Sequence, residues 1–233
     1  GRMARILLLG AISGLPWVLI GSSLNLWLKE DGLSRTAIGW AGLIFAVYAF
    51  NFLWAPLIDR IQIPWLTNRL GHRRAWIMVM QAVIVTCLGL WSIVDPVANL
   101  AAVVGVGLAI AIASATQDIA VDALRIEQVG PTEDESMAAG AATAVVGWWT
   151  GYKVGGMVAL YTAEFFQKSG LPNYWQISFI ILCIIIVLCS IGLLFVPEQQ
   201  SIDRINSQSE NDRLLSNKLG SSNVITNLIT WFV

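Results

Sequence analysis

Six long apolar runs, each long enough to cross a lipid bilayer, constrain the fold of this chain more than any other feature. A spanning helix needs about 20 apolar residues, and the runs lack the alternation of a barrel strand. The sequence therefore predicts an all-α integral membrane protein whose six-helix transmembrane bundle occupies residues 1–196. The runs cover roughly residues 5–28, 36–58, 75–94, 98–124, 137–163 and 174–196.

The composition supports a membrane class and argues against several others. The chain is 56% hydrophobic and only 12% charged, whereas a soluble domain has about 25% charged residues. No basic tract is interleaved with aromatic residues, so we expect no nucleic-acid partner. The three cysteines lie in apolar runs, and the single histidine, His72, is expected to be solvated in a loop. We therefore predict no metal, no cofactor and no enzymatic activity.

The distribution of lysine and arginine predicts the orientation. With the N-terminus in the cytoplasm, ten of the 14 basic residues fall in inner segments. The outer loops hold three, Lys29, Arg35 and Lys168. Because Lys and Arg accumulate on the cytoplasmic side of membrane proteins, we predict a multi-pass protein with a cytoplasmic N-terminus.

The chain changes character after Pro197. Residues 197–222 are polar and are predicted to form a cytoplasmic linker. The last eleven residues, 223–233, are apolar but too short to span a bilayer. We expect them to begin a seventh helix, which would make the chain the first half of a larger protein. A short tail helix is the alternative.

Two carboxylates lie inside the fourth apolar run, where ionisable groups are costly and often functional. Asp118, Asp122 and Arg125 are spaced at i, i+4 and i+7, so they share one helix face, and Gln117 flanks them. We expect this face to line a water-filled cavity rather than to meet lipid. At least one of the two acids would bind the coupling proton, or both would serve as a static latch between helices.

Lys153 is the third ionisable residue within a run. At 1.5 Å per residue, it lies about 15 Å from the level of Asp118 along the membrane normal. We therefore expect it to meet an anionic substrate in the cavity. Pairing with a carboxylate through a shifted register and snorkelling toward the interface are the alternatives. Tyr152 and Trp149 are expected either to stack on a sugar ring or to pack.

Small and polar residues mark two of the helices. Gly147, Gly151 and Gly155 are spaced four apart, a pattern that lets membrane helices approach closely. In the first run, Ser22 and Asn25 are expected to line the same cavity or to form hydrogen bonds between helices.

Several segments resemble a known family. In "APLIDRIQIPWLTNRLGHRRAW", Asp59-Arg60 and 71–74 match the two ends of the Gly-x-x-x-Asp-Arg-x-Gly-Arg-Arg signature of the major facilitator superfamily. About ten residues are inserted between the two ends, and Ala55 replaces the leading glycine. Residues 10–165 resemble the AmpG-type muropeptide permeases and the related acetyl-CoA transporters, above all in "ASATQDIAVDALRIE" and in "GAATAVVGWWTGYKVGGMVAL", where Lys153 stands in place of an arginine.

This resemblance implies the N-terminal half of a fold with 12 or more helices. It implies proton-driven import of anhydro-muropeptides across the inner membrane of Gram-negative bacteria, for peptidoglycan recycling, with an influence on β-lactamase induction. The expected partners are the anionic muropeptide, protons, the lipid bilayer and a C-terminal half. An acetyl-CoA or other anionic-metabolite permease is the alternative. The expected gating residues are Asp59, Arg60, Arg74 and Arg125.

Overall fold

The computed structural model describes residues 1–129 and 134–198. Within this part, the regular secondary structure is entirely helical, which confirms the predicted all-α class. The predicted start of a seventh helix, residues 223–233, and nearly all of the predicted linker lie outside the described residues.

The first predicted span is one continuous helical stretch with a wide turn in its middle. Pro16 lacks an N–H and so removes a bond from the helix ladder, and a π-helical turn follows it. Such turns are frequent at functional sites. The three parts are α1 (Arg2–Val18), the turn η1 (Leu19–Ser23) and α2 (Leu24–Glu30).

The second predicted span is more broken than the sequence suggests. Ser34 caps its first helix, with the side chain accepting a hydrogen bond from the N–H of Ala37 at 3.2 Å. Short 3₁₀ turns then interrupt the α-helix, and the run expected to reach residue 58 spans only to Leu53. The pieces are α3 (Arg35–Ala41), η2 (Gly42–Phe45), α4 (Ala46–Phe50), η3 (Asn51–Leu53) and α5 (Ala55–Arg60), followed by α6 (Leu66–Leu70).

Four longer helices complete the described bundle, α7 (His72–Trp91), α8 (Leu100–Val129), α9 (Asp134–Lys168) and α10 (Tyr174–Leu193). Five stretches of the described chain are long and apolar enough to cross a membrane. They are Arg2–Glu30, Arg35–Leu53, α7, α8 and α10. Helix α9 has 35 residues and ample length, but its Trp, Tyr, Gly and Lys residues lower its mean hydropathy. The sixth expected span is thus supported by its length and not by its composition.

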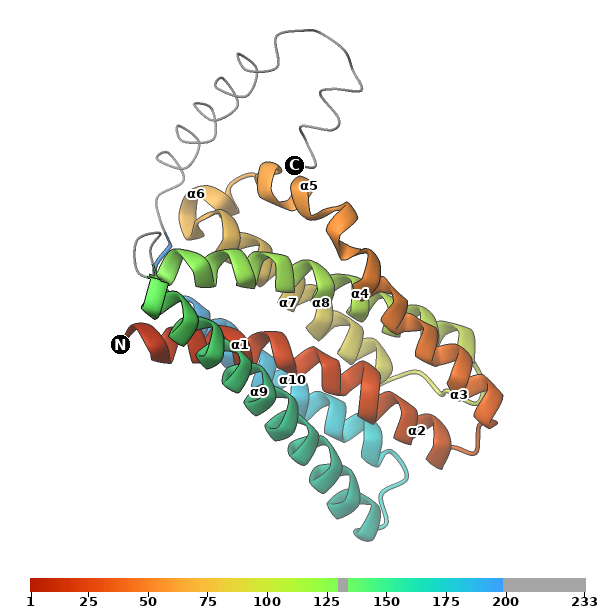
Figure 1. Ribbon diagram of the computed structural model, residues 1–233. Helices are drawn as coiled ribbons and strands as arrows, with labels where there is room; N and C mark the ends of the chain where they lie inside the picture. Colours follow the sequence, from red (N-terminus) through yellow and green to blue (C-terminus); the bar gives the residue numbers. More distant parts are fainter. Residues whose placement is uncertain (130–133, 199–233) are drawn as a thin grey trace, which may run out of the picture.

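Helix α1 is central, packing on α8, α9 and α10, while α7 packs on α8 and α10. The helices run side by side along one long axis, with the N-terminus, α5 and α6 toward one end and α2 and α3 toward the other (Figure 1). Near α2, the buried rings of Trp27, Trp91 and Phe179 pack edge-to-face or tilted, with centroids 5.1–5.9 Å apart. These rings anchor the larger of two hydrophobic cores.

The contact between α1 and α9 is a glycine seam. A methyl group on Gly14 would overlap the backbone oxygen of Trp148, and one on Gly151 would overlap the backbone oxygen of Ala11. Gly10 and Gly147 make equivalent backbone contacts. Close approach of the two backbones therefore requires glycine at these positions, as the spacing of Gly147 and Gly151 predicted.

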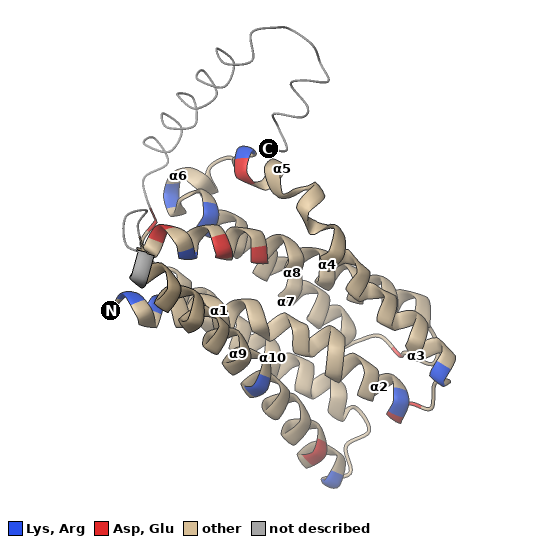
Figure 2. Cartoon of the chain, viewed as in Figure 1, with Lys and Arg blue, Asp and Glu red and all other residues tan. Residues whose placement is uncertain are grey.

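Charged residues gather toward the two ends of the bundle and leave the middle almost uncharged (Figure 2). This separation suits a protein with an apolar belt in lipid. The exceptions are the acidic stripe of α8 and one lysine midway along α9. The end that holds the N-terminus also holds α5, α6 and the start of α7 (Figure 1). These segments and the start of α1 contain Arg2, Arg5, Arg60, Arg69, Arg73 and Arg74.

Candidate transport site

Asp118 faces another helix and not the exterior. The hydroxyl of Ser13 in α1 donates a hydrogen bond of 2.5 Å to the Asp118 carboxylate in α8. Ser13 is itself buried. The pairing gives a costly carboxylate a partner within the bundle, and it places Asp118 where α1 and α8 meet.

A cavity of about 370 Å³ opens beside this carboxylate. Its wall contains Ser13, Asp118, Asp122 and Arg125, with Trp148 of α9 opposite. Arg125 and Asp122 form an ion pair of 3.2 Å, in which the Asp122 side chain is 67% exposed. An exposed pair of this kind contributes about 0–1 kcal/mol. The stripe that the sequence placed on one helix face therefore lines one hollow.

Gln117 does not reach this cavity. Its side chain is fully buried, and its amide donates to the backbone oxygen of Ile12 at 3.1 Å. The residue was predicted to contact substrate, but in this structure it ties α8 to α1. Its position next to Asp118 turns it about 100° around the helix, toward the packed side.

The predicted aromatic surface is present on α9. The rings of Trp148 and Tyr152 are stacked, with centroids 5.5 Å apart and planes 3° from parallel. Tyr152 and Ser22 share a hydrogen bond of 3.1 Å between their hydroxyls, so α9 is joined to the π-helical turn. Asn25 lies just beyond this turn and is half-buried. Three of the predicted substrate residues therefore lie on or near one contact.

Lys153 was expected in the same cavity, but it does not line the Asp118 cavity and points away from the packed interior. It is exposed, and its ammonium lies 5.5 Å from the centroid of the Trp149 ring, which is itself 49% exposed. Cation–π contacts occur at such distances. Among the described residues, no ion pair joins Lys153 to a carboxylate, so the predicted alternative of pairing has no support in this conformation.

Of the predicted gate residues, Arg74 lies in the first turn of α7. Arg74 donates to the backbone oxygen of Val196 at 3.0 Å, beyond the end of α10. The side chain of Glu198, 1% exposed, accepts hydrogen bonds from the backbone N–H groups of Arg73 (2.7 Å) and Arg74 (2.9 Å). A carboxylate at a helix N-terminus is favoured by the free N–H groups and the helix dipole.

A second contact joins α7 to α8, because the Arg73 guanidinium contacts Glu127 and the backbone oxygen of Ala123, both at 2.5 Å. Asp59 and Arg60 are the last two residues of α5, and this helix packs on α8. Sequence reasoning missed Arg73, Glu127 and Glu198 as members of this network. For Arg73 the match of residues 71–74 to the signature was an available signal, whereas Glu127 and Glu198 offered only their position at a predicted inner helix end.

His72 corrects one expectation. It was predicted to be solvated in a loop, but it begins α7 and is 5% exposed. Its Nε2 atom is hydrogen-bonded to the backbone oxygen of Ile58 at 2.8 Å. The ring satisfies a helix-end carbonyl of α5, which explains why a polar residue is buried there.

A second hollow, of about 450 Å³, lies at the opposite end of the bundle. Glu30, at the end of α2, accepts hydrogen bonds from the Tyr174 hydroxyl (3.0 Å) and the Trp175 indole (2.7 Å). Next to it, burial and the neighbouring Asp95 carboxylate raise the pKa of Asp31 above its ordinary value. No spacing or motif in the sequence distinguishes this cluster.

Comparison with known proteins identifies the family. Residues 6–233 match the profile of the Major Facilitator Superfamily. The chain is 35% identical over 209 residues to "Putative transporter AmpG 4" of Rickettsia felis, covering 89% of this chain and 48% of that protein. It is 32% identical over 197 residues to the anhydromuropeptide permease of Escherichia coli K12, covering 84% of this chain and 38% of that protein.

The chain thus spans about half the length, or less, of these relatives. The match to the superfamily covers nearly all of this chain and agrees with its helical, membrane-spanning architecture. The chain belongs to the Major Facilitator Superfamily.

Proposed function

We propose that this protein is a proton-coupled secondary transporter that imports anhydro-muropeptides from the periplasm to the cytoplasm for peptidoglycan recycling. The observation that carries the proposal is the Asp118 carboxyl, held between α1 and α8 at the wall of a cavity that also contains Asp122 and Arg125. An intramembrane acid open to water on one side is suited to bind and release a proton. The relative named anhydromuropeptide permease supports the choice of substrate.

The chemistry of the site suits such a substrate. Muropeptides combine sugar rings with several carboxylates. The stacked rings of Trp148 and Tyr152 offer an aromatic surface for sugars, with Trp149, Ser22 and Asn25 close by. Arg125 in the cavity and Lys153 on α9 offer positive charge for carboxylates. Gln117 would contact substrate only after a movement of α1 against α8.

The hydrogen-bond network at the start of α7 supports a gate at the inner end of the bundle. Asp59, Arg60 and Arg74 would hold the inner end closed, with Arg125 contributing from α8. Opening would break the contacts of Arg74 beyond α10. We place the protein in the inner membrane with its N-terminus in the cytoplasm, and the substrate site between this bundle and a C-terminal half, as in transporters built from repeats.

Uptake of a labelled substrate tests this function. Energised inner-membrane vesicles, prepared from cells that express the complete reading frame, would receive radiolabelled GlcNAc-anhydroMurNAc-peptide. We expect accumulation above the external concentration, with collapse on addition of a protonophore. Saturable binding without accumulation would identify a receptor, and inhibition by acetyl-CoA but not by muropeptide would identify the other branch of the family.

Replacing Lys153 tests the substrate charge. We expect Lys153→Ala to weaken the affinity for a carboxylate-rich muropeptide about tenfold, because one charge-assisted hydrogen bond is lost. Lys153→Arg serves as the matched control and should retain most of the affinity. Thermal stability should not change, because the side chain is exposed and has no ion pair among the described residues. A large fall in the melting temperature would instead assign Lys153 to a structural pair.

A further inference from the structure

Three buried polar atoms around Asp118 have no hydrogen-bond partner among the described residues. They are the indole Nε1 of Trp17, the hydroxyl of Tyr48 and the hydroxyl of Ser114. An unpaired buried polar group costs about 1–3 kcal/mol, and nine in ten or more are satisfied in folded proteins. Three such groups around one carboxyl indicate a ligand that hydrogen-bonds to all of them.

The three groups come from three different elements that meet beside Asp118. Ser114 lies one turn before Asp118 on the same face of α8. The Tyr48 hydroxyl, from α4, faces Ser114 and lies within electrostatic range of Asp118. The Trp17 indole, from α1, faces Asp118, and its ring packs on the Tyr48 ring with centroids 4.4 Å apart. The Tyr48 hydroxyl approaches Ser114 and the Trp17 indole approaches Asp118, but neither contact reaches the distance and angle of a hydrogen bond.

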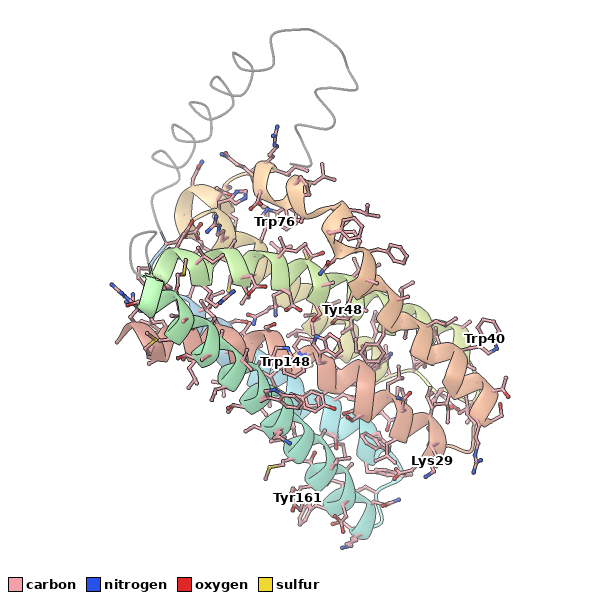
Figure 3. All side chains as sticks on the ribbon, in the orientation of Figure 1. Lys29, Trp40, Tyr48, Trp76, Trp148 and Tyr161 are labelled. Atoms are coloured by element: carbon pink, nitrogen blue, oxygen red, sulfur yellow. The ribbon has the colours of Figure 1, made fainter. Side chains whose placement is uncertain are left out.

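Figure 3 shows the setting, with Tyr48 from α4 and Trp148 from α9 approaching the middle of the bundle on the side of α1. The Trp17 ring lies between these two rings, with its centroid 5.7 Å from that of Trp148 and 4.4 Å from that of Tyr48. The rings of Trp17, Tyr48 and Trp148 therefore form one contiguous aromatic cluster. The sequence contains 11 tryptophans, and nothing in its pattern distinguishes Trp17 from the rest.

The chemistry of this set suits a water molecule. A buried water needs two to four polar partners. Here Asp118 accepts, Trp17 donates, and the hydroxyls of Tyr48 and Ser114 do either. A sodium ion fits poorly, because the Trp17 N–H can only donate and would direct its positive end at the ion.

The position of Trp17, Tyr48 and Ser114 relative to the Asp118 cavity suggests what a water bound to them would do. Asp122 and Arg125 follow Asp118 along α8, on the side of the 370 Å³ cavity. Ser114 precedes Asp118, on the side of the helix start at Leu100. Along α8, the Asp118 carboxyl therefore lies between the cavity on one side and the unpaired polar atoms of Ser114, Tyr48 and Trp17 on the other.

We propose that Tyr48, Ser114 and Trp17 hold an ordered water against Asp118, and that this water passes the coupling proton between Asp118 and the side of the transporter opposite the cavity. A hydronium ion on that side gives the water one proton as the water gives one of its own to the Asp118 carboxylate, so the water stays neutral while Asp118 changes from charged to neutral. Tyr48 is thus a positioning residue. The proposal rests on the proposed function, in which Asp118 binds the proton.

The charge that acts on Asp118 from its own helix is that of Asp122. On α8 itself, Asp122 and Arg125 face the same cavity and pair with each other. Residues 6–28 of the first helix and residues 46–50 of α4 contain no charged side chain. On α9, Lys153 is exposed at the surface.

The test separates coupling from binding. Tyr48→Phe keeps the ring that packs on Trp17 and removes only the hydroxyl. In vesicles, we expect gradient-driven accumulation of labelled anhydro-muropeptide to fall roughly tenfold, the size expected for one lost hydrogen bond to a charged group. Counterflow, in which substrate exchanges without a gradient, should stay within about twofold. Tyr161→Phe, at a tyrosine that is 66% exposed, is the matched control and should change neither rate.

A second position keeps the test decisive if Tyr48→Phe fails to fold. Ser114→Ala should show the same split between accumulation and counterflow, and Ser114→Thr should restore accumulation. Equal loss of both rates would mean a structural role and would overturn the proposal, as would unchanged accumulation in both variants. Accumulation driven by a sodium gradient instead of a proton gradient would assign the site to a metal ion and also overturn it.

The failure of this proposal can be told apart from the failure of the function. If Asp118→Asn still accumulates substrate, the proposed proton coupling at Asp118 is wrong. If Asp118→Asn abolishes accumulation while Tyr48→Phe and Ser114→Ala match the unmodified protein, the coupling stands and only the hydrated link is wrong.

Discussion

Asp118→Asn is expected to reduce proton-driven accumulation of substrate by at least about 100-fold while leaving counterflow largely intact. Asparagine has the shape of aspartate, and its amide oxygen can still accept the hydrogen bond of Ser13. It cannot take up a proton. The substitution therefore removes the proposed coupling function and keeps the contact between α1 and α8. A 100-fold effect corresponds to about 2.8 kcal/mol, within the range expected for losing an essential protonation step.

The measurement compares two rates in the same vesicles, accumulation under an imposed pH gradient and exchange of labelled for unlabelled substrate at equilibrium. Asp122→Asn is the matched comparison on the same helix face, since it removes a largely exposed carboxylate from an ion pair. If accumulation were lost only in Asp122→Asn, the coupling proton would be assigned to Asp122, one turn further along α8, instead of to Asp118. Normal accumulation in both variants would favour the static latch and contradict proton coupling by either acid.

The helical bundle could be predicted from the sequence because it follows from one constraint. Backbone groups in lipid must be satisfied within the segment, so long apolar runs have to be helices. Residue periodicity then placed Asp118 with Asp122 and Arg125, and Gly147 with Gly151, each on one face. These inferences need only the geometry of a single helix, and the structure agrees with them.

The details that were missed depend on which helices are neighbours. The partner of Asp118 is Ser13, and the residues closest to its other side are Trp17 and Tyr48, from α1 and α4. No periodicity within one run reveals such pairings. The same reason explains His72, whose burial depends on a carbonyl of α5. The interruptions after Ala41 and Phe50 were also missed, because apolar content does not distinguish α-helical from 3₁₀ turns.

The glycine seam leads to the second large effect, which is on stability. We expect Gly14→Ala to lower the melting temperature of the chain in detergent by about 5 °C or more. The added methyl would overlap the backbone oxygen of Trp148, and backbone atoms of a packed helix cannot move aside as a flexible side chain can. Helices α1 and α9 would have to separate. Overpacking of this kind typically costs 1–3 kcal/mol, or roughly 2–4 °C for each kcal/mol in a protein of this size.

Gly105→Ala, within α8, is the matched control. An added methyl there meets no other atom within 4 Å, and alanine stabilises a helix interior by about 1 kcal/mol relative to glycine. Its melting temperature should therefore equal or exceed that of the unmodified chain. Because both substitutions have the same intrinsic helix preference, their difference isolates the contact between α1 and α9. Equal melting temperatures for Gly14→Ala and Gly105→Ala would show that the two helices are not held at backbone contact. Gly10 of α1 and Trp148 of α9, which both line the Asp118 cavity, would then lie farther apart.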